Sequence, residues 1–356
     1  MDDLAPQPAA TATALPARFY VEPEMAAIDR RALFDRAWQL VAHVSQLRNA
    51  GDHVVANLAG LPVIAVRSAD DAIRVFHNVC RHRAGPIAQC DGLGAKALRC
   101  RYHGWTYTLE GRLRSAPEMQ DAVDFDVADI RLPQLAVREW QGLVFAAVEE
   151  ANAPDFDAFV EGIDARLGPD RGLERYGNHH RASYDIACNW KAYVDNYLEG
   201  YHVPHVHPGL NKLLDYRSYR TELSDWHSLQ WSPLESDASL YGNGDALYYW
   251  LWPNTMLNIL PGRLQTNIVV PLGVDRCRVV FDSYYAADGE DGKRDADLAF
   301  SDEVQHEDLG ICEDVQRGFA SGSYVPGRLN PLRETGVHHF HELLRAAYRM
   351  AAPDPA

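Results

Sequence analysis

The segments "NVCRHRAG" (residues 78–85) and "ALRCRYHGWTY" (residues 97–107) decide the fold of the first half of this chain, because they interleave cysteine and histidine. The four side chains are, in order, Cys80, His82, Cys100 and His103. Alternating ligands of this kind suit a [2Fe–2S] cluster in which one iron takes two thiolates and the other takes two imidazoles. Structural zinc is the alternative, although zinc sites usually keep their cysteine pair and their histidine pair separate.

Short β-like runs surround these ligands from about residue 50 to residue 150. The runs "PVIAV" (62–66) and "IRVFH" (73–77) flank a polar turn and predict a hairpin. Two further runs, "WTYTL" (105–109) and "LVFAAV" (143–148), lie close to turns that contain glycine. The pattern predicts an all-β domain over residues 49–150 that holds the [2Fe–2S] cluster.

The segments that flank this domain have a different character. Residues 1–19 are biased towards Ala, Pro and Thr, which predicts a disordered tail. Apolar residues at mixed helical spacing in 24–47 predict a helix. We therefore expect residues 20–48 to form an N-terminal helix that packs on the second domain.

Helical and strand patterns both occur after residue 150. A helical segment over 156–167 precedes three strand-like runs, and two helices close the chain. The runs are "TMLNIL" (255–260), "LQTNIVVPL" (264–272) and "CRVVFDSYYA" (277–286), and the helices cover 301–320 and 337–350. Residues 151–356 are thus expected to form a catalytic domain with an antiparallel sheet flanked by helices, and the fold class of the chain is α+β.

A second group of ligand-type residues lies in "DNYLEGYHVPHVH" (195–207). A non-haem Fe(II) site that activates O₂ uses two histidines and one carboxylate on one face. His202 and His205 would share a helical face, but Pro204 breaks or kinks a helix just after His202. A pair formed by His202 and His207 is equally reasonable, so spacing alone leaves both pairs open.

The carboxylate ligand has to come from another part of the chain. In 301–319 an apolar stripe at helical spacing includes Asp308. The apolar members of the stripe are Val304, Ile311, Val315 and Phe319. A carboxylate on a buried face costs several kcal/mol unless it is paired or bound to a metal. Asp308 is therefore the candidate ligand, with a buried salt bridge as the alternative role and Glu307 as the fallback ligand.

The metal motifs resemble those of Rieske non-haem iron oxygenases. "CRYHGWTYTLEGRL" (100–113) is similar to the Rieske signature of this family. Respiratory Rieske proteins carry two further cysteines, at positions where this chain has Gly85 and Tyr102. The resemblance implies that Cys80, His82, Cys100 and His103 hold the cluster.

The same resemblance settles the choice of iron ligands. "NWKAYVDNYLEGYHVPHVH" (189–207) resembles the family motif whose two histidines lie five residues apart, which implies His202 and His207 and sets His205 aside. The sequence "EDLGICEDVQ" from residue 307 is similar to the family's third-ligand helix and implies Asp308.

Glu199 has a separate role in the resemblance. In the family, a carboxylate at this position bridges an iron ligand and a cluster ligand of the next chain. The resemblance thus implies that Glu199 is an electron-transfer bridge between His202 and the partner subunit's His103, in a homotrimer. A carboxylate that accepts from both imidazoles also fixes their tautomers.

The residue type at position 199, a glutamate, resembles one branch of the family. Many ring-hydroxylating members carry aspartate here, whereas the monooxygenases of carnitine, choline and glycine betaine resemble this chain. A trimethylammonium group is recognised by aromatic rings, and "LYYWLWPN" (247–254) offers Tyr248, Tyr249, Trp250 and Trp252. Tyr248 and Trp250 are the candidate substrate contacts, and aromatic packing in the sheet core is the alternative.

Composition limits the partners of the chain. Its 356 residues carry a net charge of −16, which argues against binding to nucleic acid. No apolar run approaches the ~18 residues that span a bilayer. Six cysteines without a recognisable export signal predict reduced thiols and a cytoplasmic location.

Several other residues have no assigned chemistry. Arg81, Arg83, Arg99 and Arg101 surround the cluster ligands and either dock an acidic electron donor or form a solvated basic rim. Cys90, Cys188, Cys277 and Cys312 are expected to be buried free thiols. His338, His339 and His341 are expected at an exposed start of a helix.

The sequence as a whole predicts a terminal oxygenase component with a [2Fe–2S] cluster and Fe(II). It would use O₂ and two external electrons to hydroxylate or oxidatively demethylate a small organic substrate, with quaternary ammonium compounds as one candidate class. No G-x-G-x-x-G motif follows a strand and opens a helix, so a separate NAD(P)H-dependent reductase, with or without a ferredoxin, is the expected partner. The alternatives are the alpha subunit of an aromatic ring-hydroxylating dioxygenase and a Rieske electron carrier without oxygenase activity.

Overall fold

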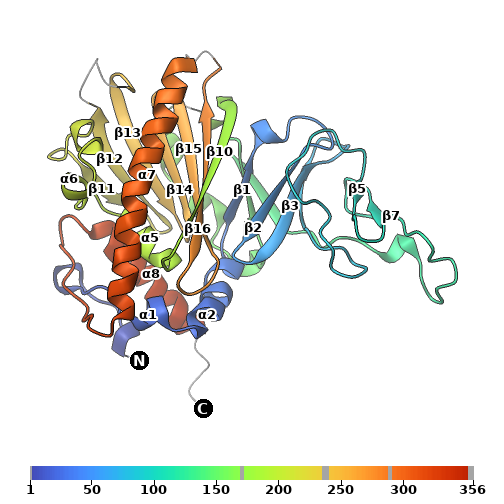
Figure 1. Cartoon of the computed structure of the whole chain (residues 1–356), viewed down its shortest axis with the longest axis horizontal. Helices are drawn as coiled ribbons and strands as arrows, with labels where there is room; N and C mark the ends of the chain where they lie inside the picture. The colour runs from blue at the N-terminus through green and yellow to red at the C-terminus, as the bar shows by residue number, and fades with distance from the viewer. Residues whose placement is uncertain (1, 169–171, 235–239, 288–290, 352–356) are drawn as a thin grey trace. The chain divides into compact units, whose positions relative to one another are not determined.

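The β-rich middle of the chain and its mixed remainder form separate units in the computed structural model, which describes residues 2–168, 172–234, 240–287 and 291–351 (Figure 1). The large unit comprises residues 1–35, 154–168 and 176–356, and the small unit comprises 36–153 and 169–175. Antiparallel sheets and helices together give the α+β class that the sequence predicts. None of the helices in the described ranges is long and apolar enough to cross a membrane.

Three small antiparallel sheets form the small unit, with strand orders β1-β9-β8, β2-β3-β4 and β5-β6-β7. The strands are β1 (Gln39–His43), β2 (His53–Leu58), β3 (Leu61–Arg67), β4 (Ile73–His77), β5 (Leu98–Arg99), β6 (Thr106–Tyr107), β7 (Leu113–Ser115), β8 (Ala136–Trp140) and β9 (Leu143–Ala147). The predicted hairpin is confirmed, because β3 and β4 pair with Val63 opposite His77. Two buried apolar clusters fill this unit, and one of them contains Cys80 and Cys100.

The predicted helix over 24–47 is wrong in its second half. The helix α2 (Glu24–Ala32) ends at Ala32, and Gln39–His43 forms strand β1. Leu40 of β1 pairs with Phe145 of β9, more than one hundred residues later, and every residue of β1 is buried. A distant pairing partner thus overrides a local helical pattern. For this reason the small unit begins at residue 36 and not at 49.

The N-terminal segment is also ordered, contrary to the predicted disordered tail. Ala12 and Leu15 are buried, and Thr13 forms a β-bridge with Arg328. Arg345 of the last helix donates to the backbone oxygens of Asp3 and Thr13. Contacts of this kind tie down a terminus even when its composition is typical of disorder. The helix α1 (Arg18–Val21) follows directly.

A seven-stranded antiparallel sheet is the centre of the large unit, with the order β10-β16-β15-β14-β13-β12-β11. The strands are β10 (Gly177–Ile186), β11 (Arg220–Leu223), β12 (His227–Leu234), β13 (Gly244–Leu251), β14 (Thr255–Leu260), β15 (Arg263–Pro271) and β16 (Cys277–Tyr285). The predicted meander is confirmed as β14-β15-β16, and the sheet extends beyond it on both sides.

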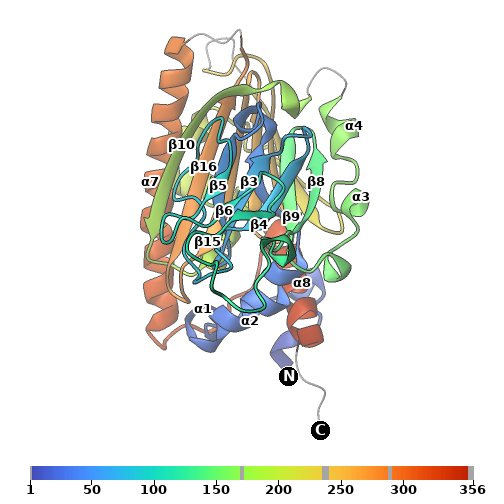
Figure 2. The ribbon, with the colours of Figure 1, turned by 90° about the vertical axis from the view of Figure 1, so that its right-hand side faces the viewer.

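Helices surround this sheet. They are α3 (Phe156–Phe159), α4 (Ile163–Leu167), α5 (Trp190–Tyr197), α6 (Val203–Val206), α7 (Asp291–Ala320) and α8 (Thr335–Ala351). The predicted helix over 156–167 is divided by Gly162, whose positive φ of 78° ends one helix and starts the next. The long helix α7 lies along one face of the sheet in both views (Figures 1 and 2).

A buried ion pair and its hydrogen bonds link α5 and α8 to the N-terminal helix α2. Lys191 of α5 is fully buried, and its Nζ lies 2.5 Å from Asp29 Oδ2 of α2. Asp29 also accepts hydrogen bonds from Trp190 Nε1 at 2.7 Å and from the Tyr348 hydroxyl of α8 at 2.5 Å. Burial lowers the pKa of Lys191, and the Asp29 carboxylate opposes that shift. Asp29 therefore satisfies donors from α5 and α8 at once.

Asp29→Ala should lower the free energy of unfolding by ~3–5 kcal/mol, because it leaves a buried ammonium without its partner. Urea unfolding measures the change. The matched control is Asp185→Ala, which removes an exposed partner of Arg278 and should cost less than ~1 kcal/mol. Equal losses in the two variants would contradict the role given to Asp29.

Candidate metal centres and substrate cavity

Two histidines flank a single helical turn that follows α5. His202 lies immediately before α6, and His207 immediately after it. Pro204 lies in the first turn of α6, where its missing N–H has no helical partner. The sequence suggested that Pro204 breaks a helix just after His202. In the structure a helix begins there, and Pro204 is compatible with its first turn. The turn brings the two Nε2 atoms to 3.2 Å from each other.

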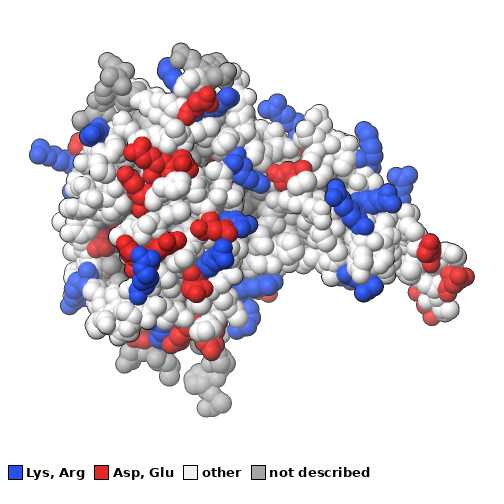
Figure 3. All heavy atoms as spheres, in the orientation of Figure 1, with Lys and Arg blue, Asp and Glu red and all other residues white. Residues whose placement is uncertain are grey.

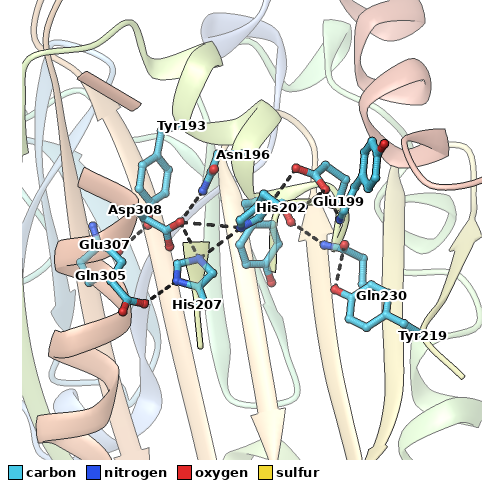
Figure 4. A network of polar contacts seen from close by, with 12 residues as sticks. Tyr193, Asn196, Glu199, His202, His207, Tyr219, Gln230, Gln305, Glu307 and Asp308 are labelled. Atoms are coloured by element: carbon cyan, nitrogen blue, oxygen red, sulfur yellow. Dashed lines mark hydrogen bonds and ion pairs between the residues drawn. The ribbon is translucent and has the colours of Figure 1, made fainter. Parts of the chain in front are cut away.

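Helix α7 brings a carboxylate to the same point. Asp308 Oδ1 lies 3.0 Å from His207 Nε2 and 3.8 Å from His202 Nε2 (Figure 4). Asn196 of α5 donates its Nδ2–H to Asp308 Oδ1 at 2.6 Å. Among the described residues, these three are the one group of His, Cys, Asp and Glu side chains whose ligand atoms all lie within 4.8 Å of one another. Two imidazoles and a carboxylate on one face are the ligand set of non-haem Fe(II) sites.

Carboxylates hold the opposite nitrogen of each imidazole. His202 Nδ1 lies 2.7 Å from Glu199 Oε1, and His207 Nδ1 lies 2.7 Å from Glu307 Oε2 (Figure 4). Because a carboxylate only accepts, each Nδ1 carries the proton and each Nε2 directs its lone pair at the shared centre. Metal-binding histidines usually donate their other N–H in this way. The residues present therefore fit Fe(II).

Glu199 lies beside a ligand and outside the ligand group. Its Oε2 accepts the backbone N–H of His202 at 3.0 Å and the backbone N–H of Tyr201. The Glu199 side chain is only 12% exposed. His205 is exposed on α6 and is not part of the group.

The buried side of α7 differs from the predicted apolar stripe. Gln305 is almost fully buried, whereas Val315 of the stripe is 40% exposed. Gln305 can be buried because it accepts the hydrogen bond of the Tyr193 hydroxyl at 2.6 Å. Asp308 does face inwards, with a side chain 15% exposed. Glu307, the fallback ligand, lies outside the ligand group and contacts Nδ1 of His207, the second histidine of the site.

Two loops of the small unit repeat one backbone pattern around Cys80 and Cys100. The N–H of Ala84 donates to the oxygen of Cys80, and the N–H of Gly104 donates to the oxygen of Cys100, each at 3.0 Å. Both donors have positive φ, 57° and 76°. The two loops thus turn back in the same way, and each presents a cysteine and the histidine that follows it.

The histidines of these loops lie together. The ring centroids of His82 and His103 are 4.6 Å apart, and His82 stacks on Trp105 at 4.7 Å. His82 Nδ1 is buried and has no hydrogen-bond partner among the described residues. A buried nitrogen without a partner requires an explanation, and ligation of iron supplies one. With Cys80 and Cys100 also buried, the four residues fit a [2Fe–2S] cluster.

Gly85 and Tyr102 lie where respiratory Rieske proteins would carry additional cysteines. A Cβ at Gly85 would lie 3.0 Å from Cys100 Sγ, so the loop leaves little room for a side chain at that position. Tyr102 is 56% exposed.

Tyr107→Phe should lower the reduction potential of the cluster by roughly 40 mV, the equivalent of one hydrogen bond of about 1 kcal/mol. The Tyr107 hydroxyl lies 3.3 Å from Cys80 Sγ and accepts the N–H of Arg81 at 3.0 Å. A donor to the thiolate stabilises the reduced, more negative cluster more than the oxidised one. A spectroscopic redox titration measures the potential, and an unchanged or higher value would contradict this role.

A cavity lined by aromatic rings opens beside the iron ligands. His202, His207 and Asp308 form part of its wall. The rings include Tyr197, Tyr219, Tyr241, Tyr248, Phe281 and Phe300. Gln230 holds one of these rings, because its Oε1 accepts from the Tyr219 hydroxyl at 2.9 Å, and its Nε2 donates to the backbone oxygen of Tyr197 at 2.5 Å (Figure 4).

Only one of the two predicted substrate contacts lines this cavity. Tyr248 is half-buried and forms part of the wall. Trp250, two residues further along β13, is fully buried and packs against Phe340 of α8 at a centroid distance of 5.2 Å. The assignment of Trp250 is therefore corrected to the core. Tyr249 and Trp252 are buried core residues as well.

The sequence predicted that the histidines near the C-terminus are exposed, and this prediction is wrong. His341 is 1% exposed, and its Nε2 lies 2.9 Å from Asp195 Oδ1. His339 is half-buried, and burial lowers its pKa to about 4. The amphipathic face of α8 points inwards at these positions, so histidine occupies a buried face of the helix.

The free cysteines follow the prediction with one exception. Cys188, Cys277 and Cys312 are buried thiols, but Cys90 is exposed. Cys188 Sγ and Cys277 Sγ lie 3.8 Å apart. Arg81, Arg83, Arg99 and Arg101 are all exposed. Figure 3 shows basic side chains gathered over the part of the chain that carries β5 and β7, whereas acidic side chains are prominent along α7.

Together, a Cys₂His₂ pair of loops and a two-histidine, one-carboxylate centre define a Rieske-type non-haem iron oxygenase. Comparison with known proteins agrees. Residues 37–136 match the Rieske [2Fe–2S] domain, and residues 173–350 match the catalytic domain of ring hydroxylating alpha subunits. The chain belongs to this family of Rieske oxygenases, and its cofactors are a [2Fe–2S] cluster and Fe(II).

Curated relatives are similar over nearly the whole chain. The chain is 34% identical to chloroplastic choline monooxygenase of Arabidopsis thaliana over 354 residues, which cover 95% of this chain and 83% of that protein. It is 30% identical to the carnitine monooxygenase oxygenase subunit of Escherichia coli (strain K12) over 357 residues, which cover 94% of each. A solved quaternary ammonium Rieske monooxygenase, described for carnitine oxidation and inter-subunit electron transfer, is 26% identical with a TM-score of 0.88 and covers 97% of this chain and 99% of that one.

Proposed function

We propose that this chain is the terminal oxygenase component of a system that hydroxylates or oxidatively demethylates a quaternary ammonium compound. The observation that carries the proposal is the aromatic wall next to the iron ligands. Tyr197, Tyr219 and Tyr248 line the same cavity as His202 and His207. Aromatic faces attract an alkylammonium group by cation–π interaction. The substrates named for the similar monooxygenases, choline and carnitine, both carry such a group.

The reaction consumes one O₂, two electrons and two protons. One oxygen atom enters a C–H bond of the substrate, and the other leaves as water. When bound, the [2Fe–2S] cluster and Fe(II) each supply one electron, and the iron activates O₂. The protein holds the two imidazoles in one tautomer through Glu199 and Glu307 and places the aromatic wall around the substrate.

Replacement of the two electrons requires a partner. The chain contains no G-x-G-x-x-G motif between a strand and a helix, so a separate NAD(P)H-dependent reductase, with or without a ferredoxin, completes the system. The exposed arginines near the cluster ligands are a basic surface on which an acidic donor can dock. A cytoplasmic location, with reduced thiols, belongs to the same proposal and is tested by fractionation.

Electrons reach the iron from the cluster of a neighbouring subunit in a homotrimer, and Glu199 is the bridge. Its position supports this role, because Glu199 and His202 line both the aromatic cavity and a second cavity. The second cavity is acidic, with Asp195 and Glu334 in its wall. His103 is exposed beside basic residues, so a partner subunit's cluster loop is complementary in charge to this cavity.

Substrate-stimulated O₂ uptake with a surrogate reductase tests the proposal. We expect trimethylammonium compounds to stimulate uptake, and aromatic acids and hydrocarbons to leave it near the background rate. The control is an Asp308→Ala protein, which should show no stimulated uptake with any compound. Stimulation by aromatic compounds alone would contradict the proposed substrate class and favour a ring-hydroxylating dioxygenase.

A further inference from the structure

A side-chain amide of α5 contacts the carboxylate of the iron-ligand group. Asn196 Nδ2 donates to Asp308 Oδ1 at 2.6 Å (Figure 4). The same oxygen lies 3.0 Å from His207 Nε2 and 3.8 Å from His202 Nε2, so it faces the centre that the imidazoles share. Each oxygen of an ionised carboxylate has about two lone-pair sites, so Oδ1 can accept from Asn196 and bind a metal at once. Asn196 therefore contacts the ligand atom itself.

This contact is the one hydrogen bond of the Asn196 side chain among the described residues. Because a carboxylate only accepts, the amide nitrogen has to face Asp308. The torsion that turns an aspartate carboxylate has broad minima, so the side chain alone does not fix its orientation. A donor at Oδ1 selects one orientation of the Asp308 carboxylate. The Asn196 amide thus serves Asp308 and no other described group.

A second hydrogen bond joins the same two helices. Tyr193 precedes Asn196 by three residues, and Gln305 precedes Asp308 by three, so each pair lies on one helical face. The Tyr193 hydroxyl donates to Gln305 Oε1 at 2.6 Å, and both side chains are buried. All four residues line the aromatic cavity. The Tyr193–Gln305 contact therefore holds α7 against α5 one turn away from the ligand.

The two imidazoles of the ligand group have a comparable support. A carboxylate accepts the Nδ1–H of each imidazole at 2.7 Å. Carboxylate ligands of metals are likewise held by hydrogen bonds, and loss of such a contact weakens the metal site. Without Asn196, Asp308 would have no hydrogen bond to any described residue outside the ligand group.

We propose that Asn196 is the positioning residue of the third iron ligand. Its N–H directs Asp308 Oδ1 at the imidazole nitrogens, and Tyr193 supports this arrangement by holding α7 through Gln305. The inference rests on the proposed function, in which Asp308 binds the iron. Asn196 acts through Asp308, so its loss should lower the affinity for iron and kcat, whereas KM for the organic substrate should change little.

Asn196→Leu tests the proposal, because leucine has a similar size and no donor. The affinity of the anaerobic protein for Fe(II), measured by competition with a ferrous chelator, should fall about 10- to 100-fold. In iron-loaded protein, magnetic circular dichroism should show shifted ligand-field bands of the Fe(II). Tyr193→Phe, which removes the more distant hydrogen bond, should lower the affinity only about two- to tenfold. Asn196→Ala, which cannot overpack the site, should match Asn196→Leu.

Gln316→Leu is the matched control for helix packing. Gln316 lies eight residues after Asp308 on α7 and is buried. Its Oε1 accepts the backbone N–H of Asn189, the residue before α5, at 2.9 Å. The variant removes a hydrogen bond between the same parts of the fold without touching a ligand. It should lower the midpoint of thermal unfolding while Fe(II) affinity stays within about threefold of wild type and the ligand-field bands do not move.

The outcomes separate this inference from the proposed function. Wild-type Fe(II) affinity and unshifted bands in both Asn196 variants would overturn the inference and leave the function standing. An equal loss of Fe(II) affinity in Gln316→Leu would also overturn it, because the effect would then come from helix packing. Full iron content in Asp308→Ala would contradict the ligand assignment of the proposed function, and this inference with it.

Discussion

Glu199→Gln should slow substrate-dependent O₂ uptake by at least ~100-fold while both metal sites remain filled, the upper range for loss of a residue that supports a ligand. Glu199 holds the Nδ1–H of His202 and lines both cavities, so it can accept a second imidazole N–H from the neighbouring subunit. A neutral amide there weakens both hydrogen bonds. In a single turnover, oxidation of the reduced cluster should become slow.

Glu307→Gln is the matched control for this prediction. Glu307 holds the Nδ1–H of His207 at the same distance, 2.7 Å, but it does not line the second cavity. This variant should weaken iron binding or turnover by ~10- to 100-fold while the cluster of iron-loaded protein is still oxidised rapidly. Equal cluster oxidation rates in the two variants would contradict a bridging role for Glu199. Loss of iron from Glu199→Ala, with iron retained in Asp308→Ala, would make Glu199 the ligand.

Asp308→Ala should abolish turnover, because it removes the only carboxylate of the ligand group in the described residues. Wild-type protein purified without oxygen should contain about three irons and two sulfides per chain, and the variant about two of each. The visible spectrum of the cluster should not change. Metal and sulfide analysis thus separates loss of the iron site from unfolding.

Glu303→Ala, an exposed position on the same helix, serves as the control and should keep all of the iron. An Asp308→Ala protein with full iron content would contradict the assignment of this ligand. Zinc without acid-labile sulfide in the wild-type protein would contradict both metal assignments.

The metal residues could be predicted from sequence because chemistry restricts them to a short local pattern. Cys80 and His82 lie two residues apart, so their spacing places them on one loop. Spacing left two histidine pairs open, and the resemblance to the family motif selected His202 and His207, which flank a single turn in the structure. Asp308 required the helical period of α7 as well. The structure brings His202, His207 and Asp308 together, and it places the rings of His82 and His103 side by side.

Residues whose role depends on distant pairing could not be found in the same way. Strand β1 has a helical pattern but pairs with β9, and Trp250 follows Tyr248 along β13 yet packs under α8. The buried ion pair of Arg263 with Asp297 likewise depends on the packing of β15 against α7, which no local pattern predicts.

A single turnover in the absence of any reductase tests the central claim most directly. The protein is reduced chemically under anaerobic conditions and then mixed with O₂, with or without a trimethylammonium compound that stimulates its O₂ uptake. The proposed mechanism predicts oxidation of at most about one substrate molecule per chain, and fast oxidation of the cluster only when substrate is present. Fully loaded protein that leaves the substrate unchanged, or a cluster that is oxidised equally fast without substrate, would contradict it.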